Sequence, residues 1–370
     1  MKIAVIPKRD ISFHHHFYRN TNLRFFFRNF YERLNFKFAA YEILYYAELA
    51  KINRNTFFLG GLHREYLKKN IPSYTTNPSA HNLHQPKRIS LKKLKKELRN
   101  FDALLVSIDS FNFYKDLIKK AKNLNIIVAI IDHPDQEDIY HEKEKSLLFK
   151  GLSKGKNFDL YFKKDIPKGM LEDDLYPLAP DPIKIENFED IKRISMNNKK
   201  NDFFFSGVLN KPITYENRKD ILEAFNSLDK SHITTIDINK HYKRELLSHF
   251  ELIENMAQSK FILSPSGRSW TTTRHTMSAV TYSCPVIPTP DCETVEMNFE
   301  DNHNVITYPM LRYLGENDRK KEALSLKEKL MYLNDAEAER ISENWREEVL
   351  SHHTTLERSK YILNTIKKYI

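Results

Sequence analysis

The chain has 370 residues, more than one hydrophobic core ordinarily serves, so we expect two domains. It contains no run of about 18 apolar residues, which excludes a predicted membrane-spanning helix. The apolar stretch at the N-terminus is too short for a signal peptide. Only two cysteines occur, neither in a CxxC or zinc-type pattern, and this favours a reduced, cytoplasmic setting.

The net charge of +10 favours a polyanionic neighbour, which could be nucleic acid, an acidic membrane surface or an anionic glycan. Positive charge is densest in residues 86–100, PKRISLKKLKKELRN. On a helix capped by Ser90, Leu91, Leu94 and Leu98 fall on one face and the lysines on the others. This segment is either a solvated surface helix packed on its own domain or a contact for anionic lipid or acceptor.

In the first half of the chain, strands and helices alternate, a pattern typical of parallel sheets covered by helices. The run Asn125–Asp132 is apolar until its last residue and predicts a central strand buried on both faces. Ligands bind beyond the C-terminal ends of such strands. The predicted strands are Ile3–Ile6, Thr56–Leu59, Ala103–Ile108, Ile126–Ile131 and Leu160–Phe162, and the predicted helices include Phe36–Ile52 and Phe113–Leu124.

Three prolines within Tyr176–Asp190 predict an interdomain linker. We place a first Rossmann-like domain at residues 1–183, a second at 184–342, and C-terminal helices at 343–370. The second domain is predicted to contain strands Phe203–Ser206, Ile233–Ile236, Phe261–Leu263, Val286–Pro288 and Val305–Tyr308, with helices Tyr215–Leu228, Glu251–Ser259 and Thr273–Tyr282 between them.

The most informative segment is Ser259–Glu293, SKFILSPSGRSWTTTRHTMSAVTYSCPVIPTPDCE. After its first strand, Gly267 permits close backbone approach, and Thr271–Thr273 begin a helix. A helix N-terminus after such a loop is a ready anion site. Arg274 stands in the first turn, where a cation opposes the helix dipole; a bound diphosphate would explain it. The alternative is that Arg274 pairs with Asp291 or Glu293 and fixes a loop.

The order SKF-x-LSP-x-G, then Arg274, then Pro285–Ile287 and Asp291, resembles the nucleotide-sugar site of exostosin-like glycosyltransferases. It is similar also to bacterial enzymes of surface-polysaccharide assembly with the GT-B fold. Phe203–Gly207 with Arg218 resembles the opening of the same domain, so the resemblance covers about residues 202–308. It implies two Rossmann-like α/β domains facing a cleft, and a C-terminal helical segment that crosses back to the first domain.

The resemblance implies that the second domain grips a nucleotide-sugar donor and that the first binds the acceptor. The donor-binding residues it indicates are Ser206, Gly207, Arg218, Ser264, Ser266, Gly267, Thr272, Thr273, Arg274 and Met277. The family usually has an acidic residue at the place of Met277, where it holds the ribose, and a Gly-Cys in place of Tyr282–Ser283. This departure implies altered donor binding or a non-catalytic copy.

A sugar transferase needs a stabiliser for the departing diphosphate, for which Arg274 is the candidate, and inverting enzymes also need a base. The candidate bases are Asp132 and Asp135, after the central strand, and Asp109, after its neighbour. The loop containing His14, His15 and His16 is a candidate acceptor contact. We expect no metal site, no cofactor and no essential metal.

Two further pairs are interpreted by position. Lys163–Lys164 is read as a solvated strand end, with phosphate contact as the alternative. His352–His353 is read as a surface pair.

The predicted function is transfer of a sugar to a glycan or lipid-linked acceptor in surface-polysaccharide assembly. We expect it in the cytoplasm, with peripheral attachment to the inner face of the membrane as an option. The alternatives are a glucosyltransferase acting on modified DNA bases and a non-catalytic nucleotide- or sugar-binding module. A dehydrogenase is disfavoured because no GxGxxG follows Ile3–Ile6.

Overall fold

The computed structural model describes residues 1–6, 49–59, 87–111, 113–132, 157–164, 166–169, 173–178, 199–209, 212–236, 247, 249–267, 270, 272–293 and 298–370. For a few of these, among them Asp109 and Thr273, it describes only the backbone. Within these ranges, none of the helices combines the length and apolar character needed to span a bilayer.

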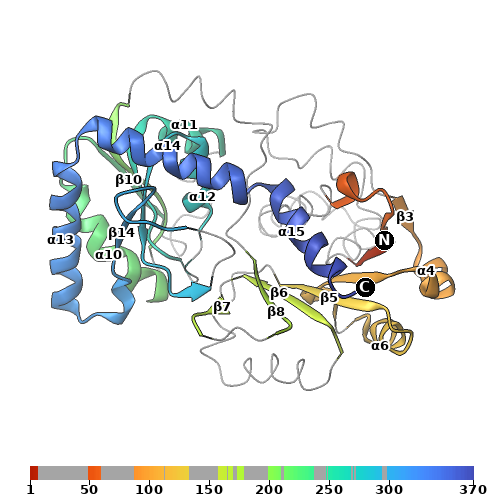
Figure 1. Ribbon diagram of the computed structural model, residues 1–370. Helices are drawn as coiled ribbons and strands as arrows, with labels where there is room; N and C mark the ends of the chain where they lie inside the picture. Colours follow the sequence, from red (N-terminus) through yellow and green to blue (C-terminus); the bar gives the residue numbers. More distant parts are fainter. Residues whose placement is uncertain are drawn as a thin grey trace, which may run out of the picture.

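The first domain is built on a seven-stranded, wholly parallel sheet (Figure 1). Its strands, in spatial order, are β3 (Lys87–Ile89), β2 (Thr56–Leu59), β1 (Ile3–Ile6), β4 (Ala103–Ser107), β5 (Ile127–Asp132), β6 (Leu160–Lys164) and β8 (Leu175–Leu178). The described helices are α4 (Leu91–Glu97), α5 (Ile108–Phe111) and α6 (Lys115–Asn123). Two apolar clusters cover the two faces of the sheet, as the unbroken apolar strands predict.

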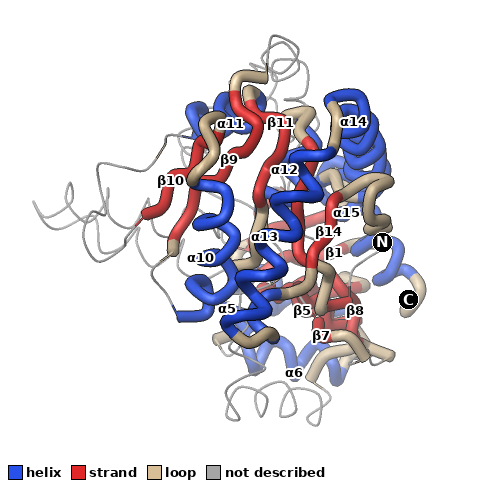
Figure 2. Tube along the Cα trace, turned by 90° about the vertical axis from the view of Figure 1, so that its left-hand side faces the viewer, coloured by secondary structure: helices blue, strands red, loops and turns tan. Residues whose placement is uncertain are grey.

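The second domain has a five-stranded parallel sheet, again with helices on its faces (Figure 2). Its spatial order is β10 (Ser231–Ile236), β9 (Asn201–Val208), β11 (Ser259–Leu263), β12 (Cys284–Pro288) and β14 (Ile306–Tyr308). Its helices are α10 (Pro212–Asn226), α11 (His249–Ala257), α12 (Thr273–Val280) and α13 (Glu316–Tyr332). The stacked rings of Phe203 and Phe261, 5.4 Å apart, join β9 to β11 in the core.

The predicted strands agree with the structure to within two residues at each end. The prediction missed β3 and β8. β8 was missed because Leu175–Leu178 overlaps the stretch taken as a linker. β8 lies at the edge of the sheet, where a proline such as Pro177 is tolerated. The predicted boundary at residues 183 and 184, and most of the predicted helix Phe36–Ile52, lie outside the described residues.

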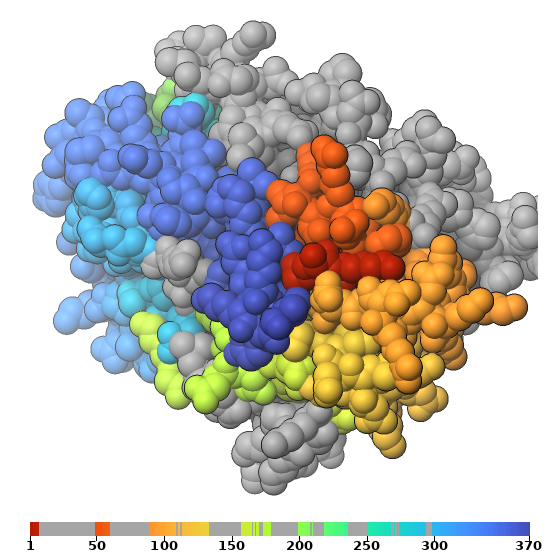
Figure 3. Space-filling view, turned by 45° about the vertical axis from the view of Figure 1, so that its right-hand side comes forward, coloured from red at the N-terminus to blue at the C-terminus, as the bar shows by residue number. Residues whose placement is uncertain are grey.

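The C-terminal helices connect the two domains. α14 (Asp335–His352) packs on the second domain, where the indole of Trp345 donates to the carbonyl oxygen of His275 at 2.8 Å. α15 (Thr355–Lys367) buries Ile362 and Ile366 against β1, and Figure 3 shows this dark blue helix beside the red first strand. The return to the first domain is confirmed. It occurs at Thr354, which caps α15, and not at residue 343.

A short antiparallel ribbon also links the domains. β7 (Ile166–Pro167) follows β6 closely and pairs with β13 (Cys292–Glu293), which follows β12. The backbone N–H of Gly169 donates to Glu293 Oε1 at 2.8 Å. Because β6 and β12 both run toward this ribbon, the C-terminal ends of the two sheets face each other.

Candidate functional site

The candidate site lies where the strand order of the second sheet reverses. β9 has β10 on one side and β11 on the other, so the chain leaves β9 and β11 in opposite directions. Ligands bind at such a point, beyond the C-terminal ends of the strands. Ser206 and Gly207 lie near the end of β9, and Ser264–Gly267 follows β11. The helices after these strands, α10 and α12, supply Arg218 and Arg274.

The two arginines cross over between these strand ends. Arg274, from the helix after β11, donates from Nη1 to the carbonyl oxygen of Ser206 on β9 at 3.0 Å. Arg218, from the helix after β9, donates from Nε to the carbonyl oxygen of Ser266 after β11, also at 3.0 Å. Both guanidiniums lie over the ring of Phe205, at 4.9 and 5.7 Å from its centroid. The structure therefore brings together two predicted donor-binding residues on one aromatic platform.

Two glycines make room for these guanidiniums. A Cβ built on Gly207 would lie 2.9 Å from the Phe205 ring and 3.3 Å from Arg274 Nη1. A Cβ built on Gly267 would lie 3.1 Å from Arg218 Nη2. Gly267 was predicted to permit close backbone approach, and Gly207 was predicted as a donor-binding residue. In the structure, close approach of the arginines already requires them.

The electrostatics of the pair favour a bound anion. Burial, and after it the charge of Arg218, lower the pKa of Arg274 to about 9, which leaves it protonated at neutral pH. Asp291 instead bonds to Arg312 and Tyr313, and Glu293 accepts from Gly169, so neither carboxylate neutralises Arg274. Two neighbouring cations repel each other, and an anion with several oxygens would relieve this repulsion.

Hydroxyl groups and a helix N-terminus surround the arginines. The Oγ atoms of Ser264 and Thr272 lie 2.8 Å apart, so the Thr272 side chain does not cap α12, although Thr272 holds the N-cap position. The Ser266 hydroxyl donates weakly to the carbonyl of Trp270 at 3.4 Å. The backbone of Thr273 begins α12, whose uncapped amide groups favour negative charge.

Sequence reasoning missed His275 and Tyr308, which belong to the same region. The fully buried imidazole of His275 donates from Nε2 to the carbonyl of Ser264 at 3.1 Å. Burial, with smaller contributions from the charges of Arg274 and Lys164, lowers its pKa to about 3, so the ring is neutral. Tyr308, at the end of β14, lies close enough to both arginines to interact with them electrostatically. Neither residue belongs to a sequence motif that would have identified it.

Met277, at the place of the expected acid, lies among apolar side chains. It packs with Ile253 and Val280 in one apolar cluster and with Phe204 and Met256 in another. Position 277 of α12 is therefore part of the apolar core between α11 and α12. This packing gives a physical reason for the departure from the family pattern.

In the first domain, the predicted base Asp132 is fully buried at the end of β5. Its Oδ2 accepts from the Tyr161 hydroxyl at 2.7 Å and from Lys163 Nζ at 3.1 Å. Its Oδ1 has no hydrogen-bond partner among the described residues. Lys163 and Lys164 are buried, at 1% and 3% exposure, so their interpretation as a solvated strand end is wrong. Lys163 is held by the neighbouring carboxylate of Asp132.

For the remaining predicted site residues the structure describes no side chain. Asp109 lies on α5, of which only the backbone is described at that position. Asp135 and the histidines His14, His15 and His16 lie outside the described residues. Where side chains are described, no group of three or more His, Cys, Asp or Glu could hold one metal ion.

Neither known family models nor curated proteins match this chain. Solved structures do match it over the whole length of both chains. Anabaena Alr3699/HepE in complex with UDP superposes with a TM-score of 0.59 at 9% identity. A glycosyltransferase from Rickettsia africae ESF-5 gives 0.54 at 11% identity and is covered to 98%. An E. coli trehalose-6-phosphate protein bound with UDP-2-fluoro glucose gives 0.56 at 9% identity. These matches confirm that the chain has the GT-B fold.

Proposed function

We propose that this protein is a glycosyltransferase that moves a sugar from a nucleotide-sugar donor to an acceptor hydroxyl. The observation that carries the proposal is the Arg218–Arg274 pair at the strand-order reversal of the second sheet. Among proteins of the same fold, HepE is bound to UDP and to glucose, and the E. coli protein to a UDP-sugar derivative. A diphosphate supplies several anionic oxygens to which both guanidiniums can donate.

In the proposed reaction, a bond forms between the acceptor oxygen and the anomeric carbon of the sugar while the bond from that carbon to the phosphate oxygen breaks. The arginines and the first amides of α12 stabilise the negative charge that develops on the leaving diphosphate. The acceptor proton passes to a base from the first domain, for which Asp132, Asp135 and Asp109 remain the candidates. Unpaired Oδ1 of Asp132 offers the lone pair that such a transfer requires.

We further propose that transfer needs no metal ion, because two guanidiniums and a helix N-terminus already offset the charge of the leaving group. Turnover is expected to survive EDTA. Loss of turnover in chelator, restored by Mn²⁺ or Mg²⁺, would contradict this part of the proposal.

The donor can be identified by a thermal-shift screen against UDP-, GDP-, ADP- and CMP-sugars, since a ligand that binds the native state raises the melting temperature. A donor at about 100 times its Kd stabilises the protein by about 2.7 kcal/mol. Arg218→Ala and Arg274→Ala should each abolish most of the shift. A full shift in both variants would place the nucleotide elsewhere.

We propose a glycan or lipid-linked acceptor of surface-polysaccharide assembly, reached in the cytoplasm at the inner face of the membrane. The supporting observation is α4, which exposes Lys92, Lys93, Lys95 and Lys96 while Leu94 packs inward. Ser90 caps this helix as predicted, and α6 lies beside it, because Lys120 Nζ donates to the carbonyl of Lys95 at 3.4 Å. Both helices present lysines to solvent.

The membrane proposal is tested by exchanging these four α4 lysines for Glu. Binding to liposomes containing anionic lipid should weaken in this variant. In the parent protein, binding should weaken with added salt, because the Debye length falls from about 10 Å at 0.1 M to about 3 Å at 1 M. The control variant reverses Lys320 and Lys321, two exposed lysines of α13 in the other domain. Tighter binding to duplex DNA than to liposomes would favour the DNA-modifying alternative. Donor binding without turnover on any acceptor would favour a non-catalytic module.

A further inference from the structure

Tyr308, at the end of β14, lies close enough to Arg218 and Arg274 to interact with both electrostatically. Its ring belongs to the core cluster that contains Phe205, the platform on which both guanidiniums lie. The side chain is 6% exposed. Its hydroxyl oxygen is shielded from solvent and has no hydrogen-bond partner among the described residues. A buried hydroxyl without a partner is costly, so its persistence at this place needs a reason.

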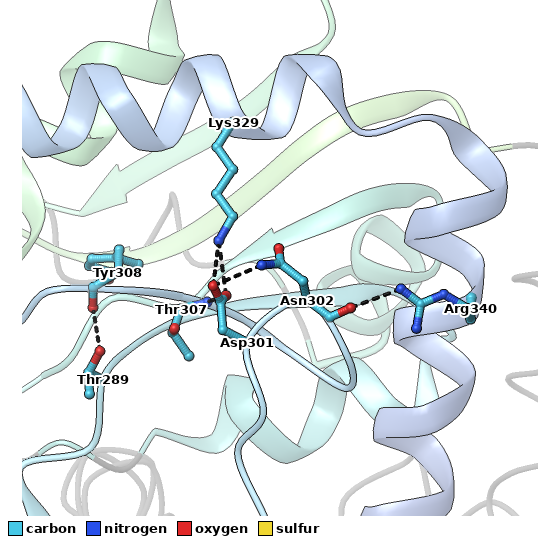
Figure 4. Close-up of polar contacts among 7 residues, drawn as sticks. All are labelled: Thr289, Asp301, Asn302, Thr307, Tyr308, Lys329 and Arg340. Carbon is cyan, nitrogen blue, oxygen red and sulfur yellow. Dashed lines mark hydrogen bonds and ion pairs between the residues drawn. The ribbon is translucent and has the colours of Figure 1, made fainter.

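The backbone of β14 holds Tyr308 in a fixed position. Thr289 donates to the carbonyl oxygen of Tyr308 from its backbone N–H at 2.8 Å and from its hydroxyl at 3.2 Å, the latter contact drawn in Figure 4. The N–H of the preceding Thr307 donates to Asp301 Oδ1 at 2.7 Å, and Lys329 pairs with the same carboxylate. The hydroxyl is therefore oriented by the strand before any ligand arrives.

The chemistry of the neighbours leaves the hydroxyl proton without an acceptor. The charged groups that act on Tyr308 are Arg218 and Arg274, and a guanidinium can only donate hydrogen bonds. Burial raises the pKa of the phenol, while the two arginines lower it, and the balance keeps the proton on the oxygen. Since no acceptor lies within reach among the described residues, a ligand that enters the site is a suitable source of one.

We propose that the Tyr308 hydroxyl donates a hydrogen bond to the same phosphate group that Arg218 and Arg274 bind. The inference rests on the proposed nucleotide-sugar donor and adds a neutral third ligand to its diphosphate. A phosphate oxygen is the acceptor best suited to this place, because the two cations draw it there and a charge-assisted hydrogen bond is stronger than a neutral one. The bound diphosphate then provides an acceptor for the Tyr308 hydroxyl, which has none among the described residues.

The test is Tyr308→Phe, which removes one oxygen and preserves the ring in the core. The probes are UDP and, as a base-independent probe, inorganic pyrophosphate, with Kd measured by calorimetry. Loss of a hydrogen bond to a charged group should raise both Kd values by about 10- to 100-fold. The melting temperature of the ligand-free variant should stay the same or rise, because an unsatisfied buried hydroxyl has been removed.

The matched control is Thr56→Val on β2, which removes a buried hydroxyl that also has no partner among the described residues but lies in the first domain. Its stability should respond as in Tyr308→Phe while both Kd values stay unchanged. Unchanged Kd values in Tyr308→Phe, together with lost binding in Arg274→Ala, would overturn this inference and leave the proposed function standing. A lower melting temperature of ligand-free Tyr308→Phe would also overturn it. If the parent protein binds neither probe, the proposed function fails as well.

Discussion

Arg218 and Arg274 belong to different helices, yet each bonds to the strand end that leads into the other's helix, and both lie over the ring of Phe205. Such a reciprocal arrangement fixes the separation of two like charges. We propose that it forms a preorganised anion site, in which the fold of the second domain offsets the repulsion between the two cations. Substitutions can distinguish effects on this site from effects on the packing that supports it.

Removal of the Arg274 guanidinium tests the site directly. Arg274→Ala should lower kcat by about 10²–10³-fold, the scale seen when a preorganised charge-stabilising donor is lost. Arg274→Lys should recover only part, because an ammonium cannot form two parallel hydrogen bonds to phosphate oxygens. The ligand-free melting temperature should change little, since the lost bond to Ser206 is offset by relief of the repulsion with Arg218.

The matched control for this variant is Arg340→Ala. Arg340, on α14, also donates to one backbone carbonyl, that of Asn302 at 2.8 Å (Figure 4). Turnover and donor Kd should remain at the parental values in Arg340→Ala. Parental turnover in well-folded Arg274→Ala would remove the main support for a glycosyltransferase.

Restoration of the acidic residue expected by the family pattern should not improve donor binding. Met277→Glu would put a carboxylate among Ile253, Val280 and Phe204, which should destabilise the protein by about 1–3 kcal/mol. Met277→Leu, which nearly conserves volume, should cost less than about 1.5 kcal/mol. Urea unfolding and donor Kd measure both effects. Tighter donor binding in Met277→Glu would show that this position does reach the ribose.

The buried ion pair of Asp132 and Lys163 should behave as one unit. Asp132→Asn or Lys163→Met alone should each destabilise the protein by about 3–5 kcal/mol, because either leaves a buried partner uncompensated. The double variant should cost clearly less than the sum of the two single changes. Additive losses would contradict the coupling. If Asp132 is the base, turnover should fall much further in Asp132→Asn than in Lys163→Met.

Two buried neutral histidines should make the protein sensitive to acid. Burial lowers the pKa of His275 and of His353 to about 3, from 6.5 in the unfolded chain. Below pH 6.5 the unfolded state binds protons that the folded state refuses, so stability is complete above pH 6.5 and falls toward pH 3. Each histidine should contribute a loss of about 1.4 kcal/mol per pH unit in this window.

His353→Gln isolates one of these contributions from the titration of carboxylates. The stability difference between this variant and the parent protein should change by about 1.4 kcal/mol per pH unit between pH 6 and 4. Urea unfolding at several pH values measures it. A difference that does not depend on pH would mean that His353 is protonated in the folded protein.

The sequence by itself determined the fold class and most of the strands of the two sheets. Apolar runs such as that of β5 reveal burial on both faces, and the Gly267 loop before Arg274 marks a strand, a turn and a helix start. These features are local, because strand burial, caps and turns depend on neighbouring residues. Arg274 was singled out by the same kind of local argument, because a cation in the first turn of a helix is repelled by the helix dipole.

Only the tertiary structure decided which groups meet. His352 is partly exposed, but His353 is fully buried at the junction of α14 and α15, where it contacts Arg358. The interpretation as a surface pair is therefore wrong for His353. The apolar position of Met277 became meaningful once α11 was packed against α12. Tyr308 is 34 residues from Arg274 and 90 from Arg218 in the chain. Their meeting depends on the order of β9, β11, β12 and β14, which long-range strand pairing sets and which no local pattern of the sequence contains.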